Sequence, residues 1–284
     1  MFNLMLENKN GDQLTFSQNS PFTVTEIQGL NPPDATINTS AVALLDGEKY
    51  ISAKVNMRQI NVAFAIEVNA ALNRINVYKV LKSKQWIRLY YDGDYRHVYI
   101  DGYIQSIDIT YFEMKQIVTC TILCPEPFFK DAQEMINELS VVVSAFHFPF
   151  ASTKEPELVM GYIDPYVSVV VENAGDTETG LIFTLIAIGA VTSPKIFDVL
   201  TGNFIGINYE FSAGDQVTID TRRGHKTITL LRNGVESNLF NSLMKNSTWL
   251  QLPASGGVYA YEVASGDASN LTVEITHYTL YEGV

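Results

Sequence analysis

Cysteine is scarce in this chain of 284 residues, which contains only Cys120 and Cys124. If the segment around them is a β-strand, both residues face the same side and lie about 13 Å apart, at about 3.3 Å per residue. A disulfide requires Cα atoms within about 7 Å, so these two cysteines do not bridge each other. With no further cysteine, a zinc framework is also excluded. We therefore expect two buried thiols.

Long hydrophobic runs and an excess of basic residues are also missing. The longest apolar run, at residues 181–191, is about half the length of a membrane span. The first residues lack a basic stretch before an apolar run, so no secretion signal is expected. The formal net charge is −12, which disfavours contact with DNA phosphates or an anionic membrane. These absences predict a soluble protein made in a cytoplasm, with no membrane insertion and no sequence-specific nucleic-acid partner.

Motifs for catalysis, metal binding and cofactor binding are absent as well. The four histidines are scattered without a metal-ligand spacing, and no nucleophile elbow, P-loop or dinucleotide fingerprint occurs. The aspartates that a glycosidase could use include Asp92, Asp94, Asp215 and Asp220, and all four lie in or beside predicted turns, where aspartate serves the backbone. We assign no catalytic, cofactor-binding or metal-binding residue, and a hydrolase is the least favoured class of function.

Alternation of apolar and polar residues dominates what is present. Strand candidates recur at roughly 8–12 residues between Gly-containing turns, which predicts a mainly β protein with a sandwich or jelly roll in its second half. Three segments break this rhythm. We predict a helix at 70–82 with Asn69 as N-cap and with Leu72 and Ile75 at helical spacing, a short helix at 130–139, and a helical turn at 240–244. Prolines and loops at 125–165 indicate a domain boundary near residue 140.

A predicted hairpin at 41–55 follows the stiff segment Asn31-Pro-Pro-Asp34 and has Asp46-Gly47 at its tip. It is apolar on both sides, with Val42, Leu44, Leu45, Tyr50, Ile51 and Val55. An isolated two-stranded hairpin is marginal in water and needs a surface to pack against. The sequence leaves two options open, namely packing on its own barrel or reaching across to a neighbouring subunit. The oligomer-interface candidates of the second option are Val42, Leu44, Leu45, Tyr50 and Ile51.

Aromatic residues in the second half raise a carbohydrate-binding alternative. Trp249, Tyr259 and Tyr261 could form a platform on which sugar rings stack. The apolar face of a β-sandwich uses the same residue types, and we favour this core interpretation over a sugar-stacking site at Trp249.

Several segments together resemble the distal tail (Dit) protein family of siphophages over essentially the full length. In the first half they are Gly29-Leu-Asn-Pro-Pro33, the Asp46-Gly47 tip followed by Arg58, the helix around Arg74, and CPEPFFKD at 124–131. In the second half they are Phe148-Pro-Phe150, VVVENAGDTETG, QVTIDTRRGHKTI and the final YEGV. The PEPFF segment is the most specific of them.

The resemblance implies both an architecture and a role. Residues 1–140 would form a ring-forming β-barrel or sandwich with the helix at 70–82 and an arm at 36–56, and residues 141–284 would form a galectin-like β-sandwich. Six copies would form a homo-hexameric ring at the phage tail tip, assembled in the bacterial cytoplasm. The ring would join the tail tube protein to the tail-associated hub or lysin and hold receptor-binding proteins.

The resemblance implies no enzyme activity and no cofactor. It also does not extend to sugar binding, because the galectin motif of His-x-Asn-x-Arg with Trp-Gly-x-Glu is missing, and Trp249 is followed by Leu-Gln-Leu. The alternative function is a carbohydrate-binding module or a receptor-binding tail protein.

Overall fold

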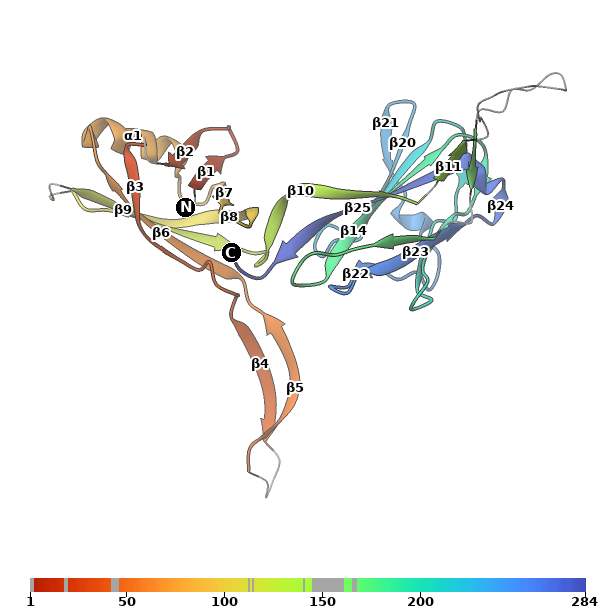
Figure 1. Ribbon diagram of the computed structural model, residues 1–284, viewed down its shortest axis with the longest axis horizontal. Coiled ribbons are helices and arrows are strands. Elements are labelled where there is room, and N and C mark those ends of the chain that lie inside the picture. Colours follow the sequence, from red (N-terminus) through yellow and green to blue (C-terminus); the bar gives the residue numbers. More distant parts are fainter. Residues whose placement is uncertain are drawn as a thin grey trace. The chain divides into compact units, whose positions relative to one another are not determined.

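The computed structural model describes residues 3–17, 20–41, 46–111, 113, 115–139, 141–144, 161–164 and 168–284. The chain divides into two compact units, the first made of Met1–Ala132 with Leu280–Val284 and the second of Gln133–Thr279. Two strands, β10 (Phe129–Glu138) and β25 (Leu271–Tyr281), run from one unit into the other (Figure 1). Compared with the expected division at residue 140, the end of the chain thus rejoins the first unit.

The first unit is an antiparallel β structure with one helix. Its other elements are β1 (Asn3–Asn8), β2 (Gln13–Phe16), β3 (Phe22–Gln28), β4 (Ala35–Ala41), β5 (Glu48–Val55), β6 (Arg58–Ile66), α1 (Ala70–Val80), β7 (Trp86–Asp92), β8 (His97–Ile109) and β9 (Gln116–Cys124). The main sheet has the order β2-β1-β7-β8-β9-β6-β3. Phe16 on β2 and Phe22 on β3 have ring centroids 6.2 Å apart, so the sheet curls until its two end strands meet.

The alternation seen in the sequence sorts the side chains of this sheet. Leu4 and Leu6 on β1 are fully buried, whereas Met5 between them is partly exposed. On the inward face of β9, Cys120 and Cys124 are both buried and unbridged, as their spacing predicts. Burial raises the pKa of each thiol to about 12. Both cysteines are therefore core residues of the first unit.

Helix α1 lies where the sequence predicts a helix, and it packs against β1, β2 and β6. Its buried side consists of Asn73, Val77 and Val80. In contrast, Leu72 and Ile75, the apolar residues at helical spacing, are 61% and 53% exposed. The helix thus buries one face in the core and leaves a second apolar face uncovered by the described part of the chain.

The start of α1 differs from the expected cap. Asn69 occupies the N-cap position with φ 47°, but its side chain makes no capping hydrogen bond. Instead the Asn73 amide donates to the carbonyl oxygen of Val68 at 2.6 Å. This bond turns Asn73 toward the preceding loop, which is consistent with its burial and with the outward position of Leu72.

The short helix predicted at 130–139 is wrong, because these residues form strand β10. Lys130 and Asp131 pair with Tyr99 and Val98 on β8, and Phe129 is buried in the core of the first unit. The segment is rich in helix-forming residues, but pairing with β8 and with β25, both distant in sequence, overrides that local preference.

The second unit is an antiparallel sandwich. Its further elements are β11 (Val141–Ser144), β12 (Gly161–Asp164), β13 (Val169–Val171), β14 (Thr179–Ala187), β15 (Val191–Thr192), β16 (Lys195–Asp198), β17 (Phe204–Gly206), β18 (Glu210–Phe211), β19 (Gln216–Asp220), β20 (Thr227–Arg232), β21 (Val235–Asn238), η1 (Phe240–Ser242), β22 (Gln251–Leu252), β23 (Gly257–Glu262), β24 (Ser265–Gly266) and η2 (Ala268–Asn270). One sheet runs β25-β14-β19-β20-β21 and a second runs β13-β23-β16-β17. The short helix η1 matches the helical turn predicted at 240–244.

The core of the second unit lies between these two sheets. Phe183 on β14 and Tyr259 on β23 meet edge to face, with ring centroids 6.2 Å apart. Both units are therefore mainly β, as the sequence predicts, and the described α-helix, α1, belongs to the first unit. Of the helices described, none has the length and apolar character needed to cross a membrane.

Candidate assembly surface

The most exposed regular element of the first unit is the hairpin formed by β4 and β5, here called the arm. Every residue of both strands is exposed, in contrast to the alternating burial of the other long strands. Figure 1 shows the arm extending away from the strands of the first unit from which it emerges. A hairpin with no buried residue gains little from its own packing. Its exposed surface is therefore available for a partner.

The strand register gives the arm two different faces. Residues directly opposite each other share a face. The pairs Ala35–Val55, Ile37–Ala53 and Thr39–Tyr50 form a mainly apolar face, which continues to Ala41–Glu48 near the tip. The alternate pairs Thr36–Lys54, Asn38–Ser52 and Ser40–Lys49 form a polar face.

A β-bulge keeps these faces separate along the whole arm. The register shifts between Asn38 and Thr39, so that Ile51 is an additional residue on β5. Without this shift, Tyr50 would pair on the polar face. In the described strands β4 and β5, the hairpin that was predicted to be apolar on both sides therefore has one apolar and one polar face. The Asn38 amide donates to the Ser52 hydroxyl at 3.0 Å across the polar face.

The candidate interface residues fall on different parts of the arm. Tyr50 and Ile51 are 60% and 61% exposed, at the bulge. Ile37 is equally exposed at 63% but is not among the interface residues predicted from the sequence. Its neighbours in the sequence are mostly polar and include two threonines, so Ile37 does not stand out as part of an apolar run. Its alternation with Ala35 along the strand could have indicated that the two share a face. The other candidates, Val42, Leu44 and Leu45, lie outside the described residues.

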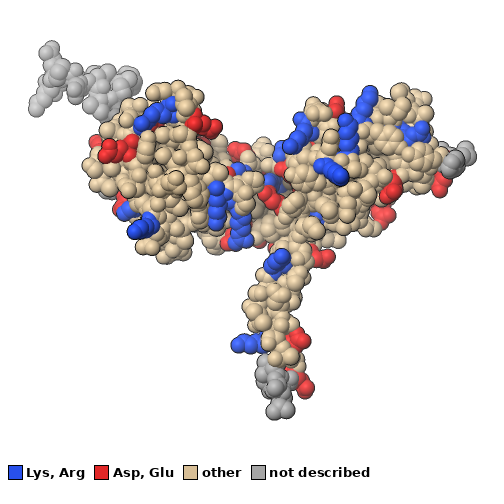
Figure 2. Space-filling model, turned by 180° about the vertical axis from the view of Figure 1, so that it is seen from behind, with Lys and Arg blue, Asp and Glu red and all other residues tan. Residues whose placement is uncertain are grey.

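Charges concentrate toward the ends of the arm. Figure 2 shows a largely uncharged middle section, with acidic and basic side chains above and below it. Asp46 and Glu48 lie at the tip end, and Lys49 and Lys54 belong to the polar face. The apolar face thus carries a carboxylate only at its tip end.

The root of the arm is anchored by one buried side chain, Arg58, which is 3% exposed. Its guanidinium donates to the carbonyl oxygens of Gly29 (2.6 Å), Asn31 (2.7 Å), Pro127 (2.6 Å) and Glu282 (2.6 Å). The guanidinium also lies over the ring of Phe129, 4.5 Å from its centroid.

Burial lowers the pKa of Arg58, whereas the neighbouring Cys124 and Glu282 act in the opposite direction. The four carbonyl dipoles compensate much of the desolvation of the cation, because hydrogen bonds from a charged donor are strong. The segments around Gly29, Arg58, PEPFF and YEGV, which are far apart in the sequence, therefore meet at one point. No pattern in the sequence indicates that Arg58 joins them.

Gly29 is also required at this root. Its φ is +91°, and a Cβ on this residue would collide with the backbone carbonyl of Gln59. On the other side of the root, the Asn56 N–H donates to the carbonyl oxygen of Asp34 at 2.9 Å. The two strands of the arm thus leave the first unit from a fixed base.

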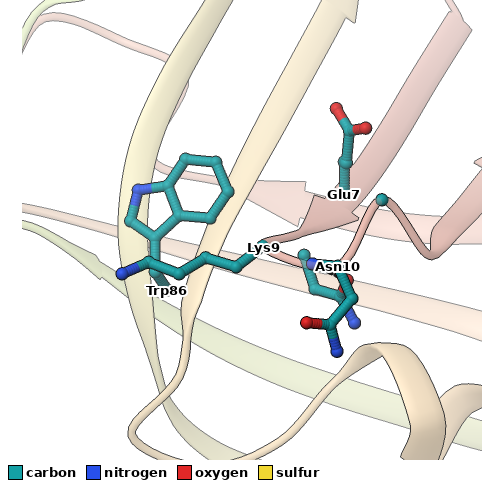
Figure 3. Close-up of a pocket in the computed structure, with 6 residues that line it drawn as sticks. Glu7, Lys9, Asn10 and Trp86 are labelled. Carbon is teal, nitrogen blue, oxygen red and sulfur yellow. Dashed lines mark hydrogen bonds between the residues drawn. The ribbon is translucent and has the colours of Figure 1, made fainter.

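A shallow hollow in the first unit lies beside the turn between β1 and β2. It is lined by Glu7, Asn8, Lys9, Asn10, Gly11 and Trp86. In Figure 3 the Lys9 side chain extends toward the Trp86 indole, and the Glu7 carboxylate points away from both. The hollow has no histidine, cysteine or serine in its lining, so these residues do not form a nucleophile–base pair.

The aromatic residues of the second unit are mainly core residues. Tyr259 and Tyr261 are 0% and 6% exposed, so they do not form a surface platform. Trp249 is half-buried and stacks on Phe240, with ring centroids 5.7 Å apart, while the Lys226 ammonium lies 5.2 Å from its centroid. These contacts occupy part of the indole surface that a sugar ring would need.

The carboxylates weighed as catalytic candidates in the second unit pair with arginines. Asp215 is 2% exposed at its side chain and accepts from Arg232 Nε at 2.6 Å. This contact holds the pKa of Asp215 below its usual value. Asp220 accepts a similar forked contact from Arg222. In the part of the chain that the structure describes, no three His, Cys, Asp or Glu side chains are grouped to bind a metal ion.

The comparisons with known proteins match the two units separately. Residues 9–124 match the model of the phage tail protein RIFT-related domain, and residues 174–280 match the C-terminal domain of the siphovirus-type tail component. No curated protein sequence matches the chain.

Solved structures share the fold along the whole chain. The SPP1 Dit protein, described as a paradigm of the hub adsorption apparatus of phages that infect Gram-positive bacteria, has a TM-score of 0.70 and 15% identity, covering 99% of each chain. A chain of the phage P2 baseplate in its activated conformation with calcium has a TM-score of 0.56 and 13% identity, covering 100% of each. A chain of the corresponding strontium structure has a TM-score of 0.51 and 14% identity, covering 98% of each.

Both units, in this order, thus correspond to the two domains of one kind of phage tail protein. The chain belongs to the siphovirus distal tail (Dit) protein family, whose members are baseplate components of the phage tail tip.

Proposed function

We propose that copies of this chain assemble into a homo-hexameric ring that serves as the structural hub of the tail tip. One face of the ring would contact the tail tube protein, the other the tail-associated hub or lysin, and receptor-binding proteins would attach at the periphery. The observation that carries the self-assembly is the arm, whose described residues are all exposed and whose apolar residues lie on one face. A solvated hairpin would not need such a face.

The size of the expected effect follows from burial. Covering a large apolar side chain contributes about 1.5–3 kcal/mol. Tyr50, Ile51 and Ile37 together would then contribute several kcal/mol per contact, and each copy in a closed ring repeats it. Placing a carboxylate in such a contact costs more than the lost burial, because the charge is removed from water without a partner.

The test compares two double variants of the arm. We expect Tyr50→Asp with Ile51→Asp to shift the protein from ring-sized particles to monomers in size-exclusion chromatography with light scattering. The matched control is Asn38→Asp with Ser52→Asp on the polar face, which also adds two carboxylates to the arm. The control should keep the oligomer, and unchanged circular dichroism should show that both variants fold. An oligomer that survives the first pair of substitutions would contradict assembly through the arm.

A further inference from the structure

The uncovered face of α1 is a second apolar surface of the first unit. Leu72 and Ile75 are more than half exposed, and Tyr78 is 38% exposed. The opposite side of the same helix is buried through Val77 and Val80. Single exposed apolar residues need no explanation, but two of them one turn apart on an ordered helix form a stripe suited to packing.

The stripe continues along α1 as a basic segment. Leu72, Ile75 and Lys79 follow one another at intervals of three or four residues, which places them along one side of α1, and Lys82 lies two residues beyond its last residue, Val80. The helix contains no acidic residue. Along its length, the stripe therefore changes from apolar to positively charged.

Along its length, the apolar face of the arm changes from apolar to negatively charged, which complements the stripe on α1. It begins with Ala35–Val55 and Ile37–Ala53, passes Thr39–Tyr50, and ends with Glu48, beyond which lies Asp46. From the Ile37 pair to the Glu48 pair is four strand residues, or about 14 Å. From Leu72 to Lys79 is seven residues, or about 10 Å along the helix axis. On both surfaces the apolar part is thus followed, within about 10–14 Å, by charge of opposite sign.

We propose that the apolar face of the arm of one copy packs along the exposed stripe of α1 in a second copy of this chain. Glu48 and Asp46 then lie near Lys79 and Lys82, and Ile37, Tyr50 and Ile51 cover Leu72 and Ile75. The inference rests on the proposed self-assembly and names its two contact surfaces. A contact between two different surfaces of identical copies propagates from copy to copy, which is the arrangement that a ring requires.

Thiol cross-linking between two different chains tests this contact. One chain carries Tyr50→Cys, and the other, enlarged by a fusion tag, carries Ile75→Cys. The native cysteines provide a low background, because both are buried and their pKa is raised to about 12. After coexpression, a short bis-maleimide should link the tagged and untagged chains into one product of distinct mass.

The matched control moves only the arm cysteine to the polar face. Ser52→Cys is two residues from position 50 but belongs to the opposite face of the arm. We expect at least a tenfold lower yield of the mixed product for Ser52→Cys with Ile75→Cys. An equal yield, or a link formed only within a single chain that carries both Tyr50→Cys and Ile75→Cys, would overturn the proposal.

A charge exchange gives an independent readout. Glu48→Lys and Lys79→Glu should each raise the concentration at which the oligomer dissociates about fivefold, as expected for a partly exposed ion pair. The double variant should return it to near the wild-type value. Additive losses in the double variant would argue against contact between these positions.

The outcomes separate this inference from the proposed function. If wild-type oligomers form but the Tyr50–Ile75 product does not, the arm–helix contact is wrong and self-assembly stands. If the wild-type chain remains monomeric at all concentrations, both the contact and the proposed self-assembly are wrong.

Discussion

Replacing Arg58 should release the base of the arm, because this side chain joins four segments that are distant in sequence. Arg58→Met keeps much of the side-chain length but removes the four hydrogen bonds to carbonyl oxygens. Each bond from a charged donor contributes about 1.5–3 kcal/mol, but their effects are not additive. Removing the buried cation also ends its desolvation cost. We therefore expect a loss of about 3–5 kcal/mol in the free energy of unfolding of the first unit.

The two tryptophans of the chain make this loss measurable by unit. Trp86 belongs to the first unit and Trp249 to the second. In urea unfolding followed by fluorescence, a Trp249→Phe background reports the first unit and a Trp86→Phe background the second. With a denaturant slope of about 2 kcal/mol per molar urea, Arg58→Met should lower the midpoint of the first unit by about 2 M.

Arg88 provides the control for this experiment. It is an arginine of the same sheet, about 30% exposed, and pairs with Asp101 at 2.6 Å. Because ion pairs at partly exposed positions contribute little, Arg88→Met should cost about 1 kcal/mol or less. The reasoning is refuted if Arg58→Met destabilises the first unit no more than Arg88→Met does, or if it shifts the Trp249 transition just as strongly.

Three further predictions concern other parts of the two cores. Gly29→Ala should destabilise the first unit by about 2 kcal/mol or more in the same urea assay, because Gly29 has a positive φ and a Cβ there would collide with Gln59. Gly11→Ala should cost less, because Gly11 also has a positive φ but faces open space. Burial lowers the pKa of His277, so only the unfolded state gains a proton as the pH falls below about 6.5. The second unit should therefore lose stability in this range by up to about 1.4 kcal/mol per pH unit. In the Trp249 transition measured between pH 7 and pH 5, His277→Leu should make this dependence of stability on pH weaker. The two native thiols should react with a chromogenic disulfide reagent in concentrated urea but hardly at all in the native protein, and rapid native reaction would contradict their burial.

The strands could be predicted from the sequence because their information is local. The EKYISAKV segment alternates in character and follows Asp46-Gly47, and β5 spans the same residues, Glu48–Val55. The helix at α1 was equally visible from its spacing. These elements depend on turn residues and side-chain periodicity, both of which can be read within about ten residues.

The misassigned segment shows where local information ends. KDAQEMINEL has the composition of a helix, and its strand conformation depends on pairing with β8 and β25, which no local pattern encodes. The choice of buried face on α1 is similar, because the inward position of Asn73 depends on the carbonyl of Val68 in the preceding loop. In both cases tertiary contacts override the local preference.

The assembly surface was predictable only in part. The apolar residues Tyr50 and Ile51 marked the arm, but the bulge that decides their face depends on the register of two strands. The role of Arg58 was hidden for a different reason. Its four acceptors are backbone carbonyls, which leave no trace in the residue types at Gly29, Asn31, Pro127 or Glu282.

The molar mass of the wild-type protein in solution tests the central claim of self-assembly most directly. One chain has a mass of 31.7 kDa, so six copies correspond to 6 × 31.7, or about 190 kDa. Light scattering across a concentration series should show a species of about 190 kDa that gives way to the single-chain mass on dilution or on introduction of Tyr50→Asp with Ile51→Asp. A constant mass of 31.7 kDa at every concentration would contradict the account.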